Sequence, residues 1–181
     1  MQNDRSNLIS ELKNYTPSPE EDKFIPQFLE LLKSDRCFYR DHFNPGHITG
    51  SALLLDQSGT KILMNFHRGL NRWLCFGGHA DGDEDILAVA IRETMEESGL
   101  TAFKPVSTDI FDIDIHPIPT NEKRDEPAHF HFDIRYIMQM TGAQDFVLSD
   151  ESIELKWMDF NTALSMIETN DSLNRMIEKL K

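Results

Sequence analysis

The chain has 181 residues, of which 39% are hydrophobic and 27% are charged, and its formal net charge is −13. This length suits a single domain with a buried core. The negative charge opposes binding to nucleic acid, because nucleic-acid binders gain affinity from contacts between cations and phosphates. No apolar run in the sequence approaches the roughly 20 residues that span a bilayer, so we expect neither nucleic acid nor a membrane as a partner.

The cysteines and the N-terminal residues predict a cytoplasmic protein. Cys37 and Cys75 are too few for a disulfide framework and are typical of a reducing compartment. The residues after Met1 contain no apolar stretch of the kind found in a secretory signal peptide. Cys75 just precedes a glycine pair, and we expect it to be a small buried hydrophobe.

Residues 1–46 are expected to form a helical extension that precedes a domain of residues 47–181. A short first helix is followed by a second helix, from about Pro19 to Lys33. Ser18 and Glu21 have the spacing of a capping box at its start, and a proline inside the segment predicts a kink or a delayed start. The extension packs on the domain or on a second subunit of a homodimer, and the sequence leaves both arrangements open.

Two apolar runs, Ser51–Leu55 and Lys61–Phe66, are separated by a turn sequence and predict a β-hairpin. The loop that follows carries Arg68 and Arg72. Two guanidinium groups near a phosphate could hold it through paired hydrogen bonds. Ordinary solvated loop charge is the alternative interpretation, so both arginines are candidate substrate contacts.

Residues 77–100 open with a glycine pair, pass through an acidic turn and continue as a helix. Asp85 is the expected N-cap, and Gly99 is the expected end of this helix. The apolar residues recur with a period near 3.6. We expect the buried side of the helix to consist of Leu87, Ile91, Thr94, Met95 and Ser98.

Three glutamates, Glu93, Glu96 and Glu97, stand at positions i, i+3 and i+4 of this helix and project from the side opposite the apolar residues. Like charges at this spacing repel by roughly 0.2–0.5 kcal/mol per pair. Arg92 can orient Glu96 but cannot neutralise three carboxylates. A divalent cation could, and Mg²⁺ or Mn²⁺ prefers oxygen ligands of this kind.

The spacing of polar and glycine residues across 78–100 resembles the signature box of the Nudix hydrolases. Thr94 departs from the pattern, because the family usually has an aliphatic residue there, and we expect only a packing adjustment from it. The resemblance implies an α/β/α sandwich with a central mixed sheet. The matching positions are Gly78, Glu84, Arg92, Glu93, Glu96, Glu97, Gly99 and the aliphatic Leu100.

The resemblance also implies roles for these residues. The three box glutamates and the Gly77 carbonyl would bind Mg²⁺ or Mn²⁺. A second set would support the loop and orient the ligands, namely Gly78, Glu84, Arg92 and Gly99. Nudix enzymes often draw a further acidic group from outside the box, and Glu151 is a candidate for it, with ordinary surface charge as the alternative.

Two strands after the box carry alternating polar residues. Ile110–Ile115 and Ala128–Met140 are expected to pair across a polar, proline-bounded loop. Their polar sides gather three histidines, three aspartates and an arginine, either as a solvated sheet face or as a recognition surface. His131 and Arg135 are candidate substrate contacts. No histidine quartet with typical ligand spacing is present, so we do not expect a structural zinc site.

The C-terminal part is expected to complete the domain. Ile153–Trp157 predicts a strand with Trp157 buried. Asn161 is the expected cap of a helix over 162–169, and Asn170 or Asp171 is the expected cap of a last helix.

The leading hypothesis is a metal-dependent hydrolase that cleaves the diphosphate linkage of a nucleoside diphosphate joined to another group. Nucleotide sugars, ADP-ribose and nucleoside triphosphates are all substrates of this type. One alternative is an isopentenyl-diphosphate isomerase, which some Nudix-fold proteins resemble, but these have a conspicuous cysteine and a degraded box. The other alternative is a non-catalytic nucleotide-sensing module, which normally has lost a box glutamate or carries a fused DNA-binding domain.

Overall fold

The computed structural model describes residues 4–167 and 171–181. The side chains predicted to cap the last helix, Asn170 or Asp171, lie outside this description. Within the described ranges, no helix combines the length and the apolar character that crossing a bilayer requires.

Eight strands form one mixed sheet within the described part of the chain. The strands are β1 (Gly46–Leu55), β2 (Lys61–His67), β3 (Arg72–Leu74), β4 (Phe76–His79), β5 (Phe103–Pro105), β6 (Asp112–Ile118), β7 (His129–Met140) and β8 (Ser152–Asp159). The helices are α1 (Asp4–Asn14), α2 (Ile25–Leu31), α3 (Ile86–Ser98), α4 (Phe160–Met166) and α5 (Asp171–Glu178), with short 3₁₀ helices η1 (Asp22–Phe24) and η2 (Glu122–Arg124).

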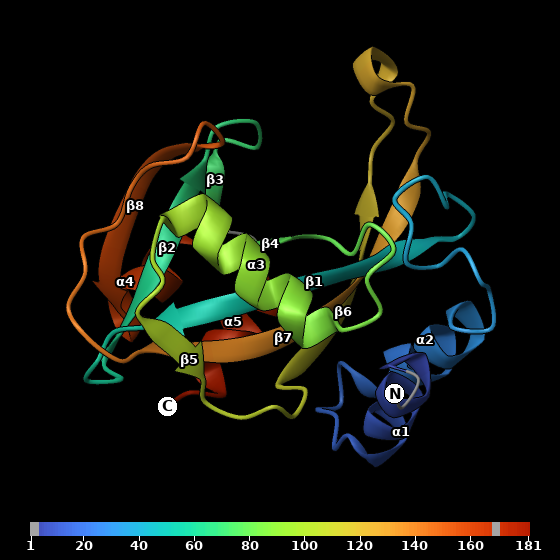
Figure 1. The fold of residues 1–181 in the computed structure, drawn as a ribbon, viewed down its shortest axis with the longest axis horizontal. Coiled ribbons are helices and arrows are strands. Elements are labelled where there is room, and N and C mark those ends of the chain that lie inside the picture. Colours follow the sequence, from blue (N-terminus) through green and yellow to red (C-terminus); the bar gives the residue numbers. More distant parts are fainter. Residues whose placement is uncertain (1–3, 168–170) are drawn as a thin grey trace.

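The sheet is organised around the pair β1 and β7, which run parallel along the whole length of β1. On one side β1 pairs with β2 and β4, both antiparallel, and β2 continues to β3 and β8. On the other side β7 pairs antiparallel with β5 and β6. The predicted hairpin and the predicted pairing of the two polar strands are therefore confirmed, and β6 and β7 extend away from the rest of the sheet with η2 at their tip (Figure 1).

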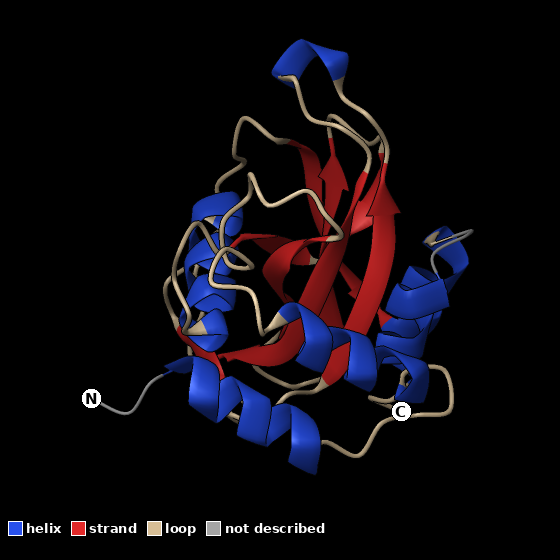
Figure 2. Ribbon diagram, turned by 90° about the vertical axis from the view of Figure 1, so that its right-hand side faces the viewer, coloured by secondary structure: helices blue, strands red, loops and turns tan. Residues whose placement is uncertain are grey.

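Helices cover both sides of the sheet, as Figure 2 shows. The box helix α3 lies across β1 and β4, and α4 and α5 lie behind the sheet (Figure 1). Two apolar clusters hold these layers together. One joins Leu54 to Val89 of α3, and the other joins Leu53 to Met176 of α5. The predicted α/β/α sandwich is confirmed, because alternate residues of β1 face the two helical layers.

The N-terminal helices contribute to the same core as the sheet. Leu8 and Leu12 of α1 are buried, and so is Phe28 of α2, whose ring meets Phe132 of β7 edge to face at 5.3 Å. The start of α1 also contacts the box loop, because the Arg5 guanidinium donates to Glu84 at 2.6 Å. The apolar side of the extension is thus buried against the same chain.

Helix α3 begins and ends where the sequence predicts, and its predicted buried side is confirmed at Thr94 and Ser98, with Leu87 and Ile91 packed against the core and partly buried. The prediction is wrong at Met95, and it missed Glu97. The Asp85 side chain accepts from the Ala88 amide at 2.9 Å, and Gly99 ends the helix in the left-handed region at φ 69°. Met95, predicted to be buried, is 40% exposed, whereas Glu97 is only 8% exposed. The helix packs on the sheet through Val89, Ala90, Thr94, Glu97 and Ser98.

Three further predictions of local structure need correction. The second helix begins at Ile25, after η1, and not at Pro19, so the delayed start predicted from the proline at position 26 is confirmed. Asp159 caps α4 by accepting from the Thr162 amide at 2.9 Å, so Asn161 is not the cap. Trp157 is only partly buried in β8. The two helix corrections are boundary effects, since strand ends and prolines fix where each helix can start.

The polar side of β6 and β7 is buried, so the solvated-face interpretation is wrong for its charged residues. Arg135 is 5% exposed. Its guanidinium donates to Asp133 at 2.6 Å, to Asp114 at 3.3 Å and to Asp112 at 3.4 Å. Arg175 of α5 donates to Asp112 at 2.8 Å. Each buried charge is therefore paired, as burial requires.

Glu21 joins the N-terminal segment to this charged group. It is fully buried, and it accepts from the Ser18 amide at 2.7 Å, from Tyr15 at 2.6 Å and from Lys179 at 2.7 Å. Half of the predicted capping box is therefore present. Burial alone would raise the pKa of Glu21, but these hydrogen bonds outweigh it and hold the pKa at about 2.

Replacing Arg135 tests whether it holds the fold together. The change Arg135→Met leaves three buried carboxylates without their shared cation, and we expect it to lower the free energy of unfolding by about 3–5 kcal/mol. Urea denaturation measures this loss. The control is Arg36→Met, which removes an exposed pair with Asp41 and should cost less than about 1 kcal/mol. Equal effects of the two changes would contradict a structural role for Arg135.

Glu21 gives a prediction about acid stability. Its folded pKa, about 2, lies below the ordinary value of 4.5, so the carboxylate stabilises the fold above pH 4.5 and loses this effect as the pH falls toward 2. Relative to Glu21→Gln, the natural protein should lose on the order of 3 kcal/mol over this range. Unfolding free energies measured against pH test this, and parallel curves for the two proteins would refute it.

Candidate active site

The glycine pair lets the box helix approach the edge of the sheet closely. Gly77 and Gly78 lie on β4, opposite Ser51 and Gly50 of β1. A Cβ at Gly77 would lie 2.2 Å from the Ser51 Oγ, and a Cβ at Gly78 would lie 2.4 Å from the Cδ of Glu93. Neither position has room for a side chain, so both contacts depend on glycine.

Glu97 is the most buried of the three box glutamates. One carboxylate oxygen accepts from the Gly77 amide at 3.3 Å, and the other accepts from the side-chain amide of Asn65 at 2.9 Å. Burial raises the pKa of Glu97 to about 7, with further contributions from the charges of Glu93 and Glu151. The carboxyl group is thus fixed in orientation and changes protonation near neutral pH.

Glu93 and Glu96 share Arg92 as a partner. The Arg92 guanidinium donates to Glu93 at 2.7 Å and to the His79 carbonyl at 2.8 Å, which ties α3 to the end of β4. Its Nε lies 3.9 Å from a carboxylate oxygen of Glu96. Burial raises the pKa of Glu93, whereas the side chain of Glu96 is 63% exposed. The three carboxylates therefore range from buried to open on one helix.

The donor atoms in this region fit a hard divalent cation. The three glutamates supply carboxylate oxygens, and the Oδ1 of Asn65 is buried without a hydrogen-bond partner among the described residues. Oxygen donors of this kind suit Mg²⁺ and Mn²⁺. Glu97 and Glu93 lie against Gly77 and Gly78 of β4, and Glu96 is exposed, so such an ion would lie at the solvent edge of the contact between α3 and β4.

The other predicted site residues lie in different surroundings. Arg68 donates to the carbonyls of Asp150 and Ser152, both at 3.0 Å, so its guanidinium holds the start of β8. Glu151 is exposed, and its charge reaches the box, since it contributes to the raised pKa of Glu93. Arg72 is exposed at the start of β3.

His131 and Arg135 belong to two different groups on the same side of β7. Arg135 is enclosed by carboxylates and is only 5% exposed, which leaves little of its side chain able to meet a substrate. His131 lies with His47 and His79, and the three side chains offer ligand atoms within 4.8 Å of one another. Burial lowers the pKa of His47 to about 4 and that of His131 to about 2, so these rings are neutral.

Several residues of the site were missed from the sequence. Asn65 is a polar residue directly after the apolar run of β2. An amide at such a position indicates that it has a hydrogen-bond partner in the interior. His47 begins the first strand, and His79 follows the glycine pair, but nothing in their spacing links them to His131. Cys75, predicted as a small buried hydrophobe, is partly buried and packs against the apolar cluster around Leu53. Desolvation raises its pKa to about 12, which disfavours thiolate chemistry near neutral pH.

Comparisons with known proteins identify the family. The model of the NUDIX domain matches residues 45–180. A protein of Lactococcus lactis subsp. cremoris, named probable DHNTP pyrophosphohydrolase, is 31% identical over 134 residues, which are 74% of this chain and 78% of the relative. The chain belongs to the Nudix hydrolase family.

Solved structures agree with this assignment at the level of the fold. The dihydroneopterin triphosphate pyrophosphohydrolase of E. coli is 16% identical, with a TM-score of 0.59, over 73% of this chain and 92% of that one. The binary complex of the C. elegans Ap4A hydrolase is 18% identical, also with a TM-score of 0.59, over 73% and 93% of the two chains. Its family makes this protein a Nudix pyrophosphohydrolase, an enzyme that cleaves diphosphate linkages.

A side chain at Gly78 should disturb the box without disturbing the rest of the domain. The added methyl group of Gly78→Ala must push Glu93 away, because its Cβ would lie 2.4 Å from the Cδ of that glutamate. We expect Mn²⁺, used as a probe, to bind about 10–100-fold more weakly, as measured by EPR titration. Gly142→Ala is the matched control, since an added Cβ there meets nothing within 4 Å. Unchanged Mn²⁺ affinity in Gly78→Ala would contradict this arrangement.

Proposed function

We propose that this enzyme hydrolyses the triphosphate group of a nucleoside or pterin triphosphate and releases diphosphate, with Mg²⁺ or Mn²⁺ as its cofactor. The broader class, a nucleoside diphosphate joined to another group, includes nucleoside triphosphates, and a pterin triphosphate presents the same diphosphate linkage on a group that is not a nucleoside. The name of the Lactococcus lactis relative, probable DHNTP pyrophosphohydrolase, favours triphosphates over nucleotide sugars and ADP-ribose.

One observation carries the proposal. The carboxylates of Glu93 and Glu97 lie against the backbone of the glycine pair. Glu96, which directly precedes Glu97, remains open to solvent. We assign these three carboxylates and the Gly77 carbonyl to the metal. When bound, the ion supplies charge neutralisation at the phosphate oxygens and a more acidic water. Arg92 orients Glu93, and Glu84 holds the box loop against Arg5.

The proton of the attacking water needs an acceptor within the site. Glu97 is held by Asn65 and Gly77 in a fixed orientation, which suits a group that must meet water in one position. Glu151 is the alternative, since it is exposed and close enough to act on the box carboxylates. Comparing Glu151→Gln with Glu97→Gln distinguishes them when both are assayed at saturating metal, because loss of the true acceptor then lowers turnover even with the metal site filled.

The negative charge of the substrate would be balanced by groups close to the site. The net charge of −13 repels a polyphosphate, so the bound cation and nearby arginines must supply the attraction. Arg72 lies opposite His67 in register, and the His67 ring approaches Glu151 at 3.7 Å, so Arg72 lies at the same edge of the sheet as this acid. We retain Arg72 as a substrate contact, and His131 as a residue next to the site. Arg68 would act by holding Glu151.

A substrate panel tests the proposal directly. The purified chain, with Mg²⁺ or Mn²⁺, is incubated with dihydroneopterin triphosphate, nucleoside triphosphates, ADP-ribose, a nucleotide sugar, Ap4A and isopentenyl diphosphate. We expect the triphosphates to be hydrolysed fastest, with diphosphate as the product. A preference for ADP-ribose or nucleotide sugars would reject the triphosphate proposal. Isomerisation without phosphate release, or binding without turnover, would support one of the two alternative functions instead.

Removing the Glu97 charge should abolish most activity and leave the fold intact. In Glu97→Gln the remaining oxygen can accept from the Gly77 amide, and the new NH2 group can donate to the Oδ1 of Asn65 once that side-chain amide turns over, so we expect normal thermal unfolding. Turnover of the best panel substrate should fall by about 10²–10⁴-fold, and chelation should stop the natural enzyme. The control is Glu30→Gln, which alters an exposed pair with Lys33 on α2. Full activity of Glu97→Gln, or of the natural enzyme in chelator, would contradict the assignment.

The location and assembly of the protein stay predictions. A cytoplasmic location rests on cysteine usage alone. A homodimer formed through residues 1–46 would have to use the outer surface of α1 and α2, because Leu12 and Phe28 are buried against the same chain.

A further inference from the structure

Five histidines lie together at one end of the β1–β7 pair. His47 of β1 is the register partner of His131 of β7, which is in turn the partner of His116 of β6. His79 of β4 is paired with Thr49, two residues along from His47 on the same side of the sheet. The rings of His47, His79, His116, His129 and His131 form a continuous set of contacts, with centroids 4.8–5.5 Å apart.

Three of these side chains converge on one point. His47, His79 and His131 each offer a ligand atom, and the three atoms lie within 4.8 Å of one another. His47 is only 1% exposed, yet its Nε2 has no hydrogen-bond partner among the described residues. A buried polar atom without a partner is costly unless something else satisfies it.

We propose that His47, His79 and His131 form a second metal site, which binds a transition-metal dication of the Zn²⁺ type. The site is separate from the box carboxylates in position and in chemistry, and its existence does not rest on the proposed function. It revises our expectation that the chain has no zinc site, which rested on spacing along the sequence.

The donor set selects the class of ion. Imidazole nitrogens suit Zn²⁺, Co²⁺, Ni²⁺ and Cu²⁺, whereas Mg²⁺ prefers oxygen. Zn–N bonds of about 2.1 Å place two nitrogens roughly 3.4 Å apart in a tetrahedron. The ligand atoms of the three histidines lie within 4.8 Å of one another, so small ring rotations are needed to bring them to this separation. His79 and His131 are only partly buried, so these two rings would supply the rotation.

The hydrogen bonds around the triad resemble those of a metal site. The Nδ1 of His47 faces the His42 carbonyl at 3.3 Å, which leaves its Nε2 as the free nitrogen. Two flanking histidines are held in the same way, His129 on the Pro127 carbonyl at 2.7 Å and His116 on the Asp114 carboxylate at 3.1 Å. Metal-binding histidines usually give their other nitrogen to such a carbonyl or carboxylate, which fixes ring orientation.

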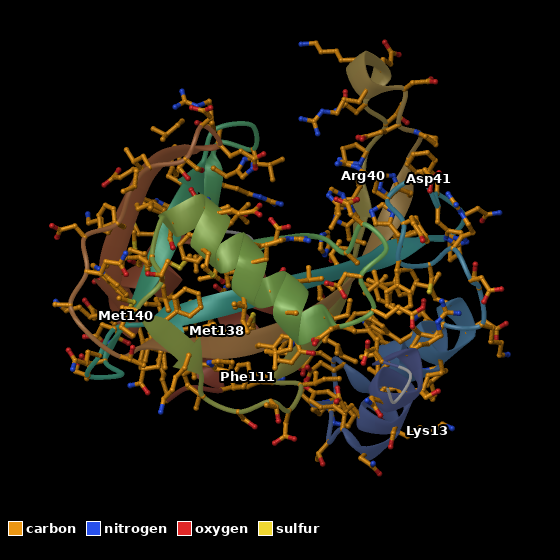
Figure 3. The ribbon with its side chains drawn as sticks, in the orientation of Figure 1. Lys13, Arg40, Asp41, Phe111, Met138 and Met140 are labelled. Atoms are coloured by element: carbon orange, nitrogen blue, oxygen red, sulfur yellow. The ribbon has the colours of Figure 1, made fainter. Side chains whose placement is uncertain are left out.

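Charges of both signs surround the histidine triad. Arg40, which Figure 3 shows beside the β6–β7 strands, is the positive charge that acts on His79, and it forms an ion pair with Glu126 at 3.7 Å. The negative charges of Asp81 and Glu126 act on the same ring. The negative groups therefore outnumber the arginine at His79, whereas Arg40 opposes a cation at His47, so the imidazole nitrogens and not the surrounding charges would hold the ion.

The position of His79 separates the new site from the box. Successive residues of a strand point to opposite sides, so Gly78 faces Glu93 of α3 while the ring of His79 lies with His47 and His131. An ion bound to the triad would join β4 to β1 and β7. It would hold the strand that carries the glycine pair without touching the box carboxylates.

Metal titration tests the proposal on the full chain. Chelator-treated protein is titrated with Co²⁺, whose visible absorption reports tetrahedral coordination, and then with Zn²⁺ in competition. We expect one tight site per chain. Loss of a ligand should exceed the effect of losing an outer partner, so His47→Gln and His79→Gln should each weaken Zn²⁺ binding by at least about 100-fold.

Two control proteins make the result specific. His67→Gln changes a histidine outside the cluster and should bind Zn²⁺ like the natural chain. The double change Glu96→Gln and Glu97→Gln should also leave the tight Zn²⁺ site in place, which separates it from the box. His79→Gln lies on a partly exposed position, so it remains informative if His47→Gln does not fold. The proposal is overturned if no tight site exists, if both histidine variants retain it, or if the double glutamate variant removes it.

Discussion

The parallel pairing of β1 with β7 is the constraint on which the rest of the molecule depends. Both strands alternate polar and apolar residues at this end, and their register places the polar ones on a single side. Thr49 and Ser51 donate to Asp133 at 2.9 and 2.7 Å, and Asp133 in turn accepts from Arg135. A shift of one residue would turn these groups toward the apolar layer under α3, so the register is strongly specified.

The same ladder positions the box helix through one backbone amide and one side-chain amide. Ser51 lies against Gly77, and the Gly77 amide donates to Glu97. Asn65 of β2 holds the other oxygen of that carboxylate. Glu97 is therefore fixed by two strands at once, which explains why a charged residue is on the buried side of α3. The energetic penalty of burying it is met by hydrogen bonds and by a pKa near neutrality.

Much of this arrangement could be predicted from local sequence, and the predictions that failed did so for a physical reason. The caps of α3, the hairpin and the β6–β7 pair follow from patterns within a few residues, and all were found. The burial of Glu97 on α3 was missed because periodicity considers only apolar residues. The carboxylate can be buried because Asn65, on another strand, donates a hydrogen bond to it. Asp159 and Asn161 are both good capping residues, and only the end of β8 decides between them. The group of Arg135 was seen as a polar strand face, but its burial depends on α5.

Long-range geometry also explains why the histidine triad escaped notice. Its members come from three strands that are adjacent in the sheet and distant in the chain, so no spacing rule finds them. Once β4 is placed, its alternation divides two chemistries between its two sides. Gly78 admits carboxylate oxygens from α3, and His79 adds an imidazole to the opposite side. Hard and borderline cations would then bind on opposite sides of one strand according to their preferred donor atoms.

The same strand also links the two sites. Because Arg92 donates a hydrogen bond to the carbonyl of His79, the backbone of that residue contacts the box while its ring belongs to the triad. A change in the position of β4 would therefore be felt on both sides, which makes this short strand the physical link between them.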